Sequence, residues 1–335
     1  MYRTITRPRI AATNSGAIMS QTTKIRWVIA HEPLSLFLRA AKDFQNYLNA
    51  NQTAEKIEVE IMTLSEYSQR YNDGVVVTKH DLLDLMEAGK IEMSQMYTTW
   101  LAEYYDQDML VLDLPYLFND HDHATRVLEG EVGEFLLDKI SDKSNVRGLS
   151  FTYSGGFRNM ISSKSVSTLE QLTGTTQRSN RNPVAQATCR AIGVTPFPCE
   201  IEDARKSIED GLCEGGETVF SRIYPLGQNE VTESVVNTEH SLFLTSMIIG
   251  DKFWDSLSPE VRAIIKDAAI EAGREERAET IRDGNAARQQ LIADGVGIYD
   301  LSAQERETLR QRTQVVYTQF ADMFTPGLVS KIKLA

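Results

Sequence analysis

Strand-like and helix-like segments alternate along the first third of this chain, and this alternation limits the folds it can adopt. Residues 24–30 place apolar side chains on one face, as a half-buried strand does, and residues 57–61 repeat the pattern. Between them, residues 35–48 carry apolar side chains at helical spacing, and another helix begins at Leu82. Residues 66–79 are polar and irregular, which indicates a loop or an insertion. The sequence therefore predicts an α/β fold with a parallel-type sheet covered by helices.

The last third of the chain is predicted to be helical. Ser258 suits an N-cap, and Pro259 suits the first helical position after it. Residues 271–290 are mostly polar, with opposite charges spaced three or four apart. A long helix of this kind suits an element that lies across two lobes. Residues 302–305 form a capping box that opens a last helix, whose apolar stripe extends to Met323.

Composition excludes several classes of function. The chain has 335 residues, 41% of them apolar, which is enough for one or two domains with a sizeable core. Its net charge of −12 repels phosphate backbones, so we expect no nucleic-acid partner. No stretch approaches ~18 consecutive apolar residues, so we expect no transmembrane helix and no direct membrane insertion. An acidic protein that binds an anion must concentrate positive charge locally.

The N-terminus lacks an evident export signal. Residues 1–20 contain three arginines and several small residues, but they lack the apolar run of about 7–15 residues that a secretory signal needs. We expect residues 1–23 to be a disordered N-terminal segment.

Residues 148–217 combine glycine-marked turns with two arginines, Arg158 and Arg178. A guanidinium presents a planar fork of donors that matches a carboxylate bidentately. One arginine can clamp an anion while the second orients it, so the block suits an anion-binding pocket. The alternative for Arg158, judged from the residues alone, is a surface arginine in a turn.

Five short segments carry a further signal: Asp113–Phe118, Gly155–Arg158, Gln171–Arg178, Ile192–Pro196 and Gly211–Thr218. Together they resemble the substrate-binding subunits of TRAP (tripartite ATP-independent periplasmic) transporters. Each motif is weak by itself, but all occur in the family's order and at similar spacing, and the resemblance extends from about Lys24 to the C-terminus.

The resemblance implies a two-lobed periplasmic-binding-protein-like fold with a long helix spanning both lobes. Lobe I would comprise residues 24–155 plus 244–283, and lobe II would comprise residues 156–243 plus 284–335. It also implies that the lobes close on a small organic acid and that the loaded protein works in the periplasm with TRAP membrane permease subunits. We expect a monomer, with a dimer as the alternative.

The resemblance also assigns candidate ligand contacts. Arg178 would form a bidentate salt bridge with the ligand carboxylate, and Arg158 would contact it as well. Thr218 stands where the family usually has Asn, and its hydroxyl can donate only one hydrogen bond. Glu217 matches an acidic position and is expected to support an arginine. The remaining candidate contacts are His31, Tyr97, Thr98 and Asn182.

Two of these assignments have alternatives. The residues around Arg178 are polar, where the family has an apolar strand, although Thr175 and Thr176 still favour a strand. Arg181 would replace Arg178 if the register slipped by three residues. His31 has an equally good interpretation as an ordinary exposed loop histidine.

No catalytic or cofactor motif accompanies these residues. The chain lacks a Gly-x-Ser-x-Gly elbow, a phosphate loop, a His-Glu-x-x-His zinc motif and a glycine-rich dinucleotide turn, so we expect neither enzymatic activity nor a cofactor. Residues 120–123 read Asp-His-Asp-His, but adjacent side chains point apart, and Asp120 suits a helix cap better than a metal site. The three cysteines are expected to be small thiols, with a Cys189–Cys199 disulfide left open.

These observations predict an extracytoplasmic solute-binding protein of a TRAP transporter. The first alternative is a signal-less soluble binding or sensor protein of the same fold without a permease partner. The second is an enzyme on a related two-lobe fold, which the missing acid–base and metal residues disfavour.

Overall fold

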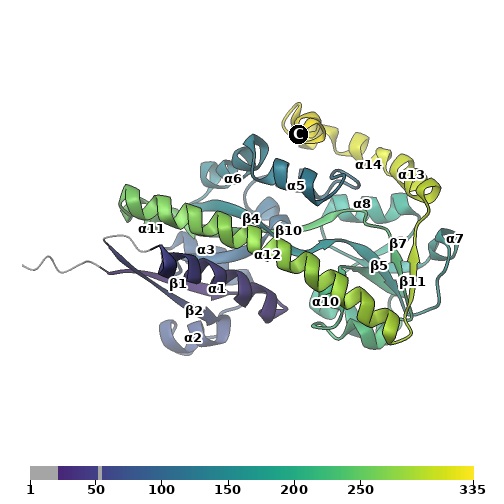
Figure 1. Cartoon of the computed structure of the whole chain (residues 1–335), viewed down its shortest axis with the longest axis horizontal. Helices are drawn as coiled ribbons and strands as arrows, with labels where there is room; N and C mark the ends of the chain where they lie inside the picture. The colour runs from purple at the N-terminus through teal and green to yellow at the C-terminus, as the bar shows by residue number, and fades with distance from the viewer. Residues whose placement is uncertain (1–21, 52–54) are drawn as a thin grey trace, which may run out of the picture.

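The computed structural model describes residues 22–51 and 55–335. The prediction of a disordered N-terminal segment lies mostly outside these residues, but Thr22 and Thr23 belong to the first strand rather than to that segment. The chain forms two α/β lobes, and one long helix runs across both (Figure 1).

Each lobe is built around one sheet. The first sheet has the strand order β2-β1-β3-β10-β4, and the second has the order β11-β9-β5-β8-β6-β7. The strands of the first sheet are β1 (Thr22–Ile29), β2 (Lys56–Thr63), β3 (Met93–Tyr97), β4 (Val146–Phe157) and β10 (Leu242–Gly250). Those of the second are β5 (Asn159–Ser162), β6 (Thr176–Ser179), β7 (Thr195–Pro198), β8 (Gly215–Thr218), β9 (Ser234–Asn237) and β11 (Gly297–Asp300).

Both sheets are mixed, so the prediction of a parallel-type sheet is confirmed for the strands of the first third of the chain but does not extend to the whole of either sheet. β1 is parallel to β2 and β3, but β10 is antiparallel to β3 and β4. In the second sheet, β5 is antiparallel to β8 and β9. The chain leaves the first lobe through β4 and returns through β10. Two strands that carry the chain in opposite directions pair antiparallel and need no crossover helix.

Helices cover both sheets. Those of the first lobe are α1 (Leu34–Ala50), α2 (Leu64–Tyr71), α3 (Leu82–Glu87), α4 (Thr98–Tyr104), α5 (His121–Leu128), α6 (Glu131–Lys143) and α11 (Asp251–Ser256). Those of the second are α7 (Leu169–Leu172), α8 (Pro183–Ile192), α9 (Ala204–Glu209) and α10 (Phe220–Ile223). After α12 (Pro259–Ala293) come α13 (Ala303–Arg312), α14 (Gln314–Gln319) and α15 (Leu328–Leu334). No helix in the described ranges is both long and apolar enough to cross a bilayer.

Helix α2 occupies part of the segment that the sequence indicated as a loop. Thr63 and Glu66 form a capping box, in which the Glu66 carboxylate accepts from the Thr63 N–H at 2.8 Å. Only Tyr67 and Ser68 of this helix are buried. With so little buried surface, the helix shows no apolar periodicity.

The predicted last helix is interrupted. Its capping box at Ser302 is confirmed, but α13 ends at Arg312. The Thr313 hydroxyl donates to the Leu309 carbonyl at 2.8 Å, a local bond of the kind that bends helices. The chain then folds back, so that α15 packs on α6 of the first lobe. The predicted lobe boundaries stay a proposal. They assign α15 to lobe II and α6 to lobe I, so this contact joins the two predicted lobes.

The long helix α12 confirms the predicted spanning element. It begins after Ser258, whose hydroxyl oxygen accepts from the Val261 N–H at 3.2 Å. It packs on α1 and β4 in the first lobe and on α10 and β11 in the second. Glu276 is fully buried in it and accepts from the Tyr153 N–H and the Thr280 hydroxyl, each at 2.7 Å. Burial raises the pKa of Glu276 to about 7 despite those two bonds.

We expect Glu276→Gln to stabilise the protein at pH 8 and to leave its stability unchanged at pH 4. The pKa of about 7 lies above the ordinary value of 4.5, so the folded chain holds this proton more tightly than the unfolded chain. That contribution is complete below pH 4.5 and is lost as the pH rises through 7. Glutamine stays neutral, so the gain should approach about 3 kcal/mol. Urea unfolding of both proteins at pH 4, 6 and 8 measures it, and parallel pH profiles would contradict the assignment.

Candidate ligand-binding site

A cavity of about 420 Å³ lies between the two lobes. Its first-lobe wall includes His80, Tyr97, Thr99, Trp100 and Tyr104, together with Phe243. Its second-lobe wall includes Arg178, Asn180, Arg181, Asn182 and Glu200. A wider hollow of about 830 Å³ lies along β1 and β2 and contains none of the predicted site residues.

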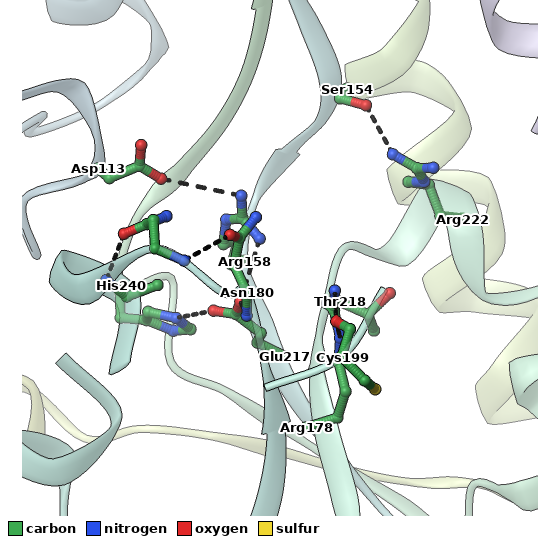
Figure 2. A network of polar contacts seen from close by, with 12 residues as sticks. Asp113, Ser154, Arg158, Arg178, Asn180, Cys199, Glu217, Thr218, Arg222 and His240 are labelled. Atoms are coloured by element: carbon green, nitrogen blue, oxygen red, sulfur yellow. Dashed lines mark hydrogen bonds and ion pairs between the residues drawn. The ribbon is translucent and has the colours of Figure 1, made fainter. Parts of the chain in front are cut away.

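Arg178 brings an unpaired positive charge to the cavity wall. It lies on β6, between β7 and β8, and only 3% of it is exposed. Its Nε and Nη2 donate to the Cys199 carbonyl at 2.9 and 2.7 Å (Figure 2). No carboxylate in the described part of the chain forms an ion pair with it. A buried cation without a counter-ion is unfavourable, so this position is prepared to receive an anion.

Arg158, in contrast, already has acidic partners. Its Nη1 lies 3.4 Å from Glu217 Oε1, and its Nη2 lies 3.9 Å from Asp113 Oδ1. Its guanidinium carbon is 3.8 Å from the centroid of the Phe243 ring, a cation–π contact. Arg158 is buried and does not line the cavity, so in this conformation it supports the wall from behind.

Glu217 is the charged partner in this cluster. Burial alone would raise its pKa, but the Arg158 charge and the hydrogen bond with His240 outweigh burial and hold the pKa at about 2. Its Oε1 also accepts from the Asn180 N–H at 2.6 Å. Asp113 behaves differently, because burial raises its pKa to about 7 against the attraction of Arg158. Glu217 thus forms its ion pair with Arg158, whereas Arg178 attracts it only from beyond ion-pair distance and keeps its guanidinium without a paired carboxylate among the described residues.

The other predicted contacts divide into two groups. Tyr97 and Asn182 line the cavity, as Arg178 does. Thr218 is buried and donates to Gln228 Oε1 at 2.7 Å, and Thr98 donates to the Leu244 carbonyl at 3.2 Å. In this conformation Thr98, Thr218, His31, Arg158 and Glu217 lie behind the wall. Direct contact with a ligand stays a prediction for all eight residues.

His31 is buried, so its interpretation as an exposed loop histidine is wrong. Its ring centroid lies 4.2 Å from that of Tyr97 and 5.4 Å from that of Trp100. Burial, followed by the charges of Lys79 and Arg222, keeps its pKa well below the ordinary value. The neutral His31 ring therefore packs against Tyr97 and Trp100 of the cavity wall without adding charge.

Asn182 opens α8 as its N-cap. Its Oδ1 accepts from the Ala185 N–H at 2.8 Å, with Pro183 following at the first helical position. Its Nδ2 is buried and has no partner in the described structure. Asn182 as a residue lines the cavity, as Arg178 does.

Arg222 is a buried residue that the sequence analysis missed. It lies on α10, fully buried, and donates to Ser154 Oγ at 2.7 Å (Figure 2). It donates to the Tyr97 hydroxyl at 3.0 Å as well. It also donates to the Glu32 carbonyl. It therefore links the second lobe to the first behind the cavity. An arginine on a four-residue helix gives no sequence signal that separates it from a surface residue.

Lys79 joins the lobes at a second place. Its Nζ lies 3.1 Å from Glu200 Oε2 and 3.3 Å from Glu202 Oε2, although Lys79 belongs to the first lobe and both acids to the second. Less than a third of each side chain is exposed. Partial burial strengthens these ion pairs relative to surface pairs.

The remaining sequence candidates have structural roles. Asp120 is the N-cap of α5 and accepts from the His123 N–H at 2.7 Å, as predicted. Within the described ranges, no three His, Cys, Asp or Glu side chains gather into a group that could hold a metal ion. Cys189, Cys199 and Cys213 are all buried and free, so the disulfide left open by the sequence is not formed.

Comparison with known proteins identifies similar chains over most of this length. The model of bacterial extracellular solute-binding protein, family 7 (DctP), matches residues 30–323. The C4-dicarboxylate-binding periplasmic protein DctP of Rhodobacter capsulatus is 23% identical over 281 residues, covering 81% of this chain and 84% of that protein.

Solved structures of TRAP periplasmic solute-binding proteins share the fold. One from Pseudomonas putida F1, with bound D-glucuronate, has a TM-score of 0.77 at 21% identity and covers 93% of this chain and 97% of its own. One from Shewanella oneidensis, with bound succinate, has a TM-score of 0.78 at 20% identity and covers 93% of this chain and 99% of its own.

Proposed function

The chain belongs to family 7 of the bacterial extracellular solute-binding proteins, and we propose that it captures a small organic acid between its lobes. The observation that carries this proposal is Arg178, a buried guanidinium on the cavity wall without a carboxylate partner among the described residues. A relative named for C4-dicarboxylates and structures holding D-glucuronate and succinate support it, since each of these ligands has a carboxylate.

Capture would proceed by closure of the two lobes. A ligand favours the closed form only if it contacts that form better than the open one. Arg178 would hold the carboxylate from the second lobe, while Tyr97 would meet the ligand from the first. Arg222 and Lys79 join the lobes only when they are close together, so both would add to the stability of the closed form.

The loaded protein would deliver its ligand in the periplasm to TRAP membrane permease subunits, unchanged and as a monomer. The alternative is a binding or sensor protein of the same fold without a permease partner. Genes for a small and a large permease subunit beside this one would favour transport. Recovery of a chemically altered ligand would instead indicate an enzyme.

A thermal-shift screen of the purified protein against organic acids, amino acids, sugar acids and neutral sugars tests the proposal. A ligand at 100 times its dissociation constant should add about 2.7 kcal/mol of stability. We expect the stabilising compounds to be carboxylates. Stabilisation by neutral sugars alone would contradict the proposal.

We expect Lys79→Met to weaken ligand binding about fivefold. The substitution removes the ion pairs with Glu200 and Glu202, which exist only when the lobes are closed, at a cost of about 1 kcal/mol. The matched control is Lys139→Met, because Lys139 also pairs with two acids, Asp106 and Asp108, but within one lobe. Calorimetric titration of both variants measures the difference. Equal affinities would show that the Lys79 pairs do not contribute to closure.

A further inference from the structure

We propose that the ligand carries one carboxylate and a ring, and that Trp100 and Glu103 make the site select it over linear dicarboxylates. This inference rests on the proposed function and names the substrate class of the same site. It follows from the unequal walls of the cavity, one aromatic and one polar.

The first-lobe wall is aromatic. Tyr97 stacks on Phe243 with ring centroids 5.2 Å apart and planes 23° from parallel. Trp100 stacks on His80 at 4.9 Å and 24°, and Tyr104 lies 6.2 Å from Trp100. All five side chains line the cavity. The ring surface that these residues present to the cavity can bind a ligand ring by dispersion and by release of water.

The same wall offers no unpaired cation to a second carboxylate among the described residues. Lys79 Nζ lies 5.7 Å from the centroid of the Trp100 ring, but it pairs with two glutamates and does not line the cavity. Among the described first-lobe residues that do line it, the only permanently charged one is Glu103, which is exposed and has no ion-pair partner in the described structure. A second carboxylate that reached this wall would meet like charge rather than a counter-ion.

The other arginines do not supply that second cation either. Arg158 is neutralised by Glu217, and Arg222 is fully buried behind Tyr97. Arg181 lines the cavity on the same wall as Arg178, but 64% of its side chain is exposed, and it lies 3.6 Å from Glu200. An exposed, paired arginine contributes little to affinity. The cavity therefore has one strong anion position.

The second-lobe wall adds hydrogen-bond donors beside Arg178. The Asn182 Nδ2 is unpartnered in the described structure, and Asn180 also lines the cavity. These amides suit a polar substituent on the ring, as in a sugar acid, and the aromatic wall suits the ring itself, as in an aryl acid. The shared chemistry is a ring that bears one carboxylate.

Calorimetric titration of the full chain with D-glucuronate, phenylacetate and succinate tests the inference. We expect at least one of the two ring acids to bind at least tenfold tighter than succinate. Tighter binding of glucuronate would assign the hydroxylated ring, and tighter binding of phenylacetate the plain aromatic ring. Succinate binding as tight as that of both ring acids would overturn the inference.

Two variants test the residues themselves. Trp100→Ala should weaken the preferred ring acid roughly tenfold, whereas Trp100→Phe should keep most of its affinity. Glu103→Lys should improve succinate binding at least fivefold, whereas Glu233→Lys, which makes the same charge change outside the cavity, should not. An unchanged affinity in both Trp100→Ala and Glu103→Lys would overturn the inference.

Failure of the inference and failure of the proposed function give different results. If succinate binds best and Arg178→Ala abolishes its binding, the carboxylate receptor stands and the ring preference falls. If the three acids bind wild type and Arg178→Ala equally, or bind neither, the proposed carboxylate site falls and the inference falls with it.

Discussion

Arg178→Ala is expected to reduce the affinity for the ligand acid by about 30-fold to several thousandfold. Removing one partner of a desolvated charge pair costs about 2–5 kcal/mol, because the other charge is left buried and unpaired. Arg178 suits this role because only 3% of it is exposed, and within the described ranges its side chain donates only to the Cys199 carbonyl. Calorimetric titration with the best acid from the screen measures the loss.

Arg181→Ala is the matched control for that experiment. Arg181 lies on the same wall and was the alternative carboxylate ligand in the sequence, but its side chain is 64% exposed. We expect its loss to weaken binding less than about fivefold. A larger effect of Arg181→Ala than of Arg178→Ala would mean that the register of the motif had been misassigned. Circular dichroism establishes that both variants are folded.

Glu217→Ala is expected to lower the free energy of unfolding by about 3–5 kcal/mol at pH 7. Breaking a buried ion pair from one side leaves the other charge unpaired, which is why the cost is large. Arg158 would keep only Asp113, whose pKa is about 7, and the Asn180 N–H would lose its acceptor. Urea unfolding measures the change.

The control and the pH dependence sharpen the Glu217 prediction. Glu209→Ala removes an exposed glutamate paired with Arg205 one helical turn away, and it should cost less than about 0.5 kcal/mol. The Glu217 pKa of about 2 lies below the ordinary 4.5, so its contribution is present above pH 4.5 and is lost as the pH falls toward 2. A Glu217→Ala effect no larger than that of Glu209→Ala would contradict the buried-pair assignment.

The helices and strands that could be predicted from the sequence are those whose signal lies in their own residues, such as a helix cap or an alternation of apolar side chains. Ser258 and Ser302 begin helices because their hydroxyls accept from backbone N–H groups three residues on. The alternation in residues 24–30 and 57–61 also leads directly to β1 and β2. Long-range pairing has no such signal, so the antiparallel placement of β10 had to come from the structure.

The buried polar side chains explain why the site was only partly predictable. Gln177, Arg178 and Ser179 are all buried on β6, although periodicity analysis assumes that buried positions are apolar. Arg222 is hidden in the same way, since its acceptors come from segments far away in sequence. A polar core at a binding site violates the local rules because the ligand, rather than the protein, completes its interactions.

The cavity walls illustrate the same limit. The partners of Trp100 are not evident from the sequence. His80 stacks on it from the turn that precedes α3, and Tyr104 follows it by one helical turn on α4. Only the folded chain shows that these rings face the wall that carries Arg178 and Asn182.

The most direct test of a carboxylate site is a calorimetric comparison of each stabilising acid with its uncharged primary amide. The two compounds have nearly the same size and shape, so they differ mainly in the charge that Arg178 would receive. We predict that the acid binds and that the amide binds at least about 30-fold more weakly, which corresponds to about 2 kcal/mol. Equal affinities of acid and amide would contradict the account, because the unpaired guanidinium would then play no part in recognition.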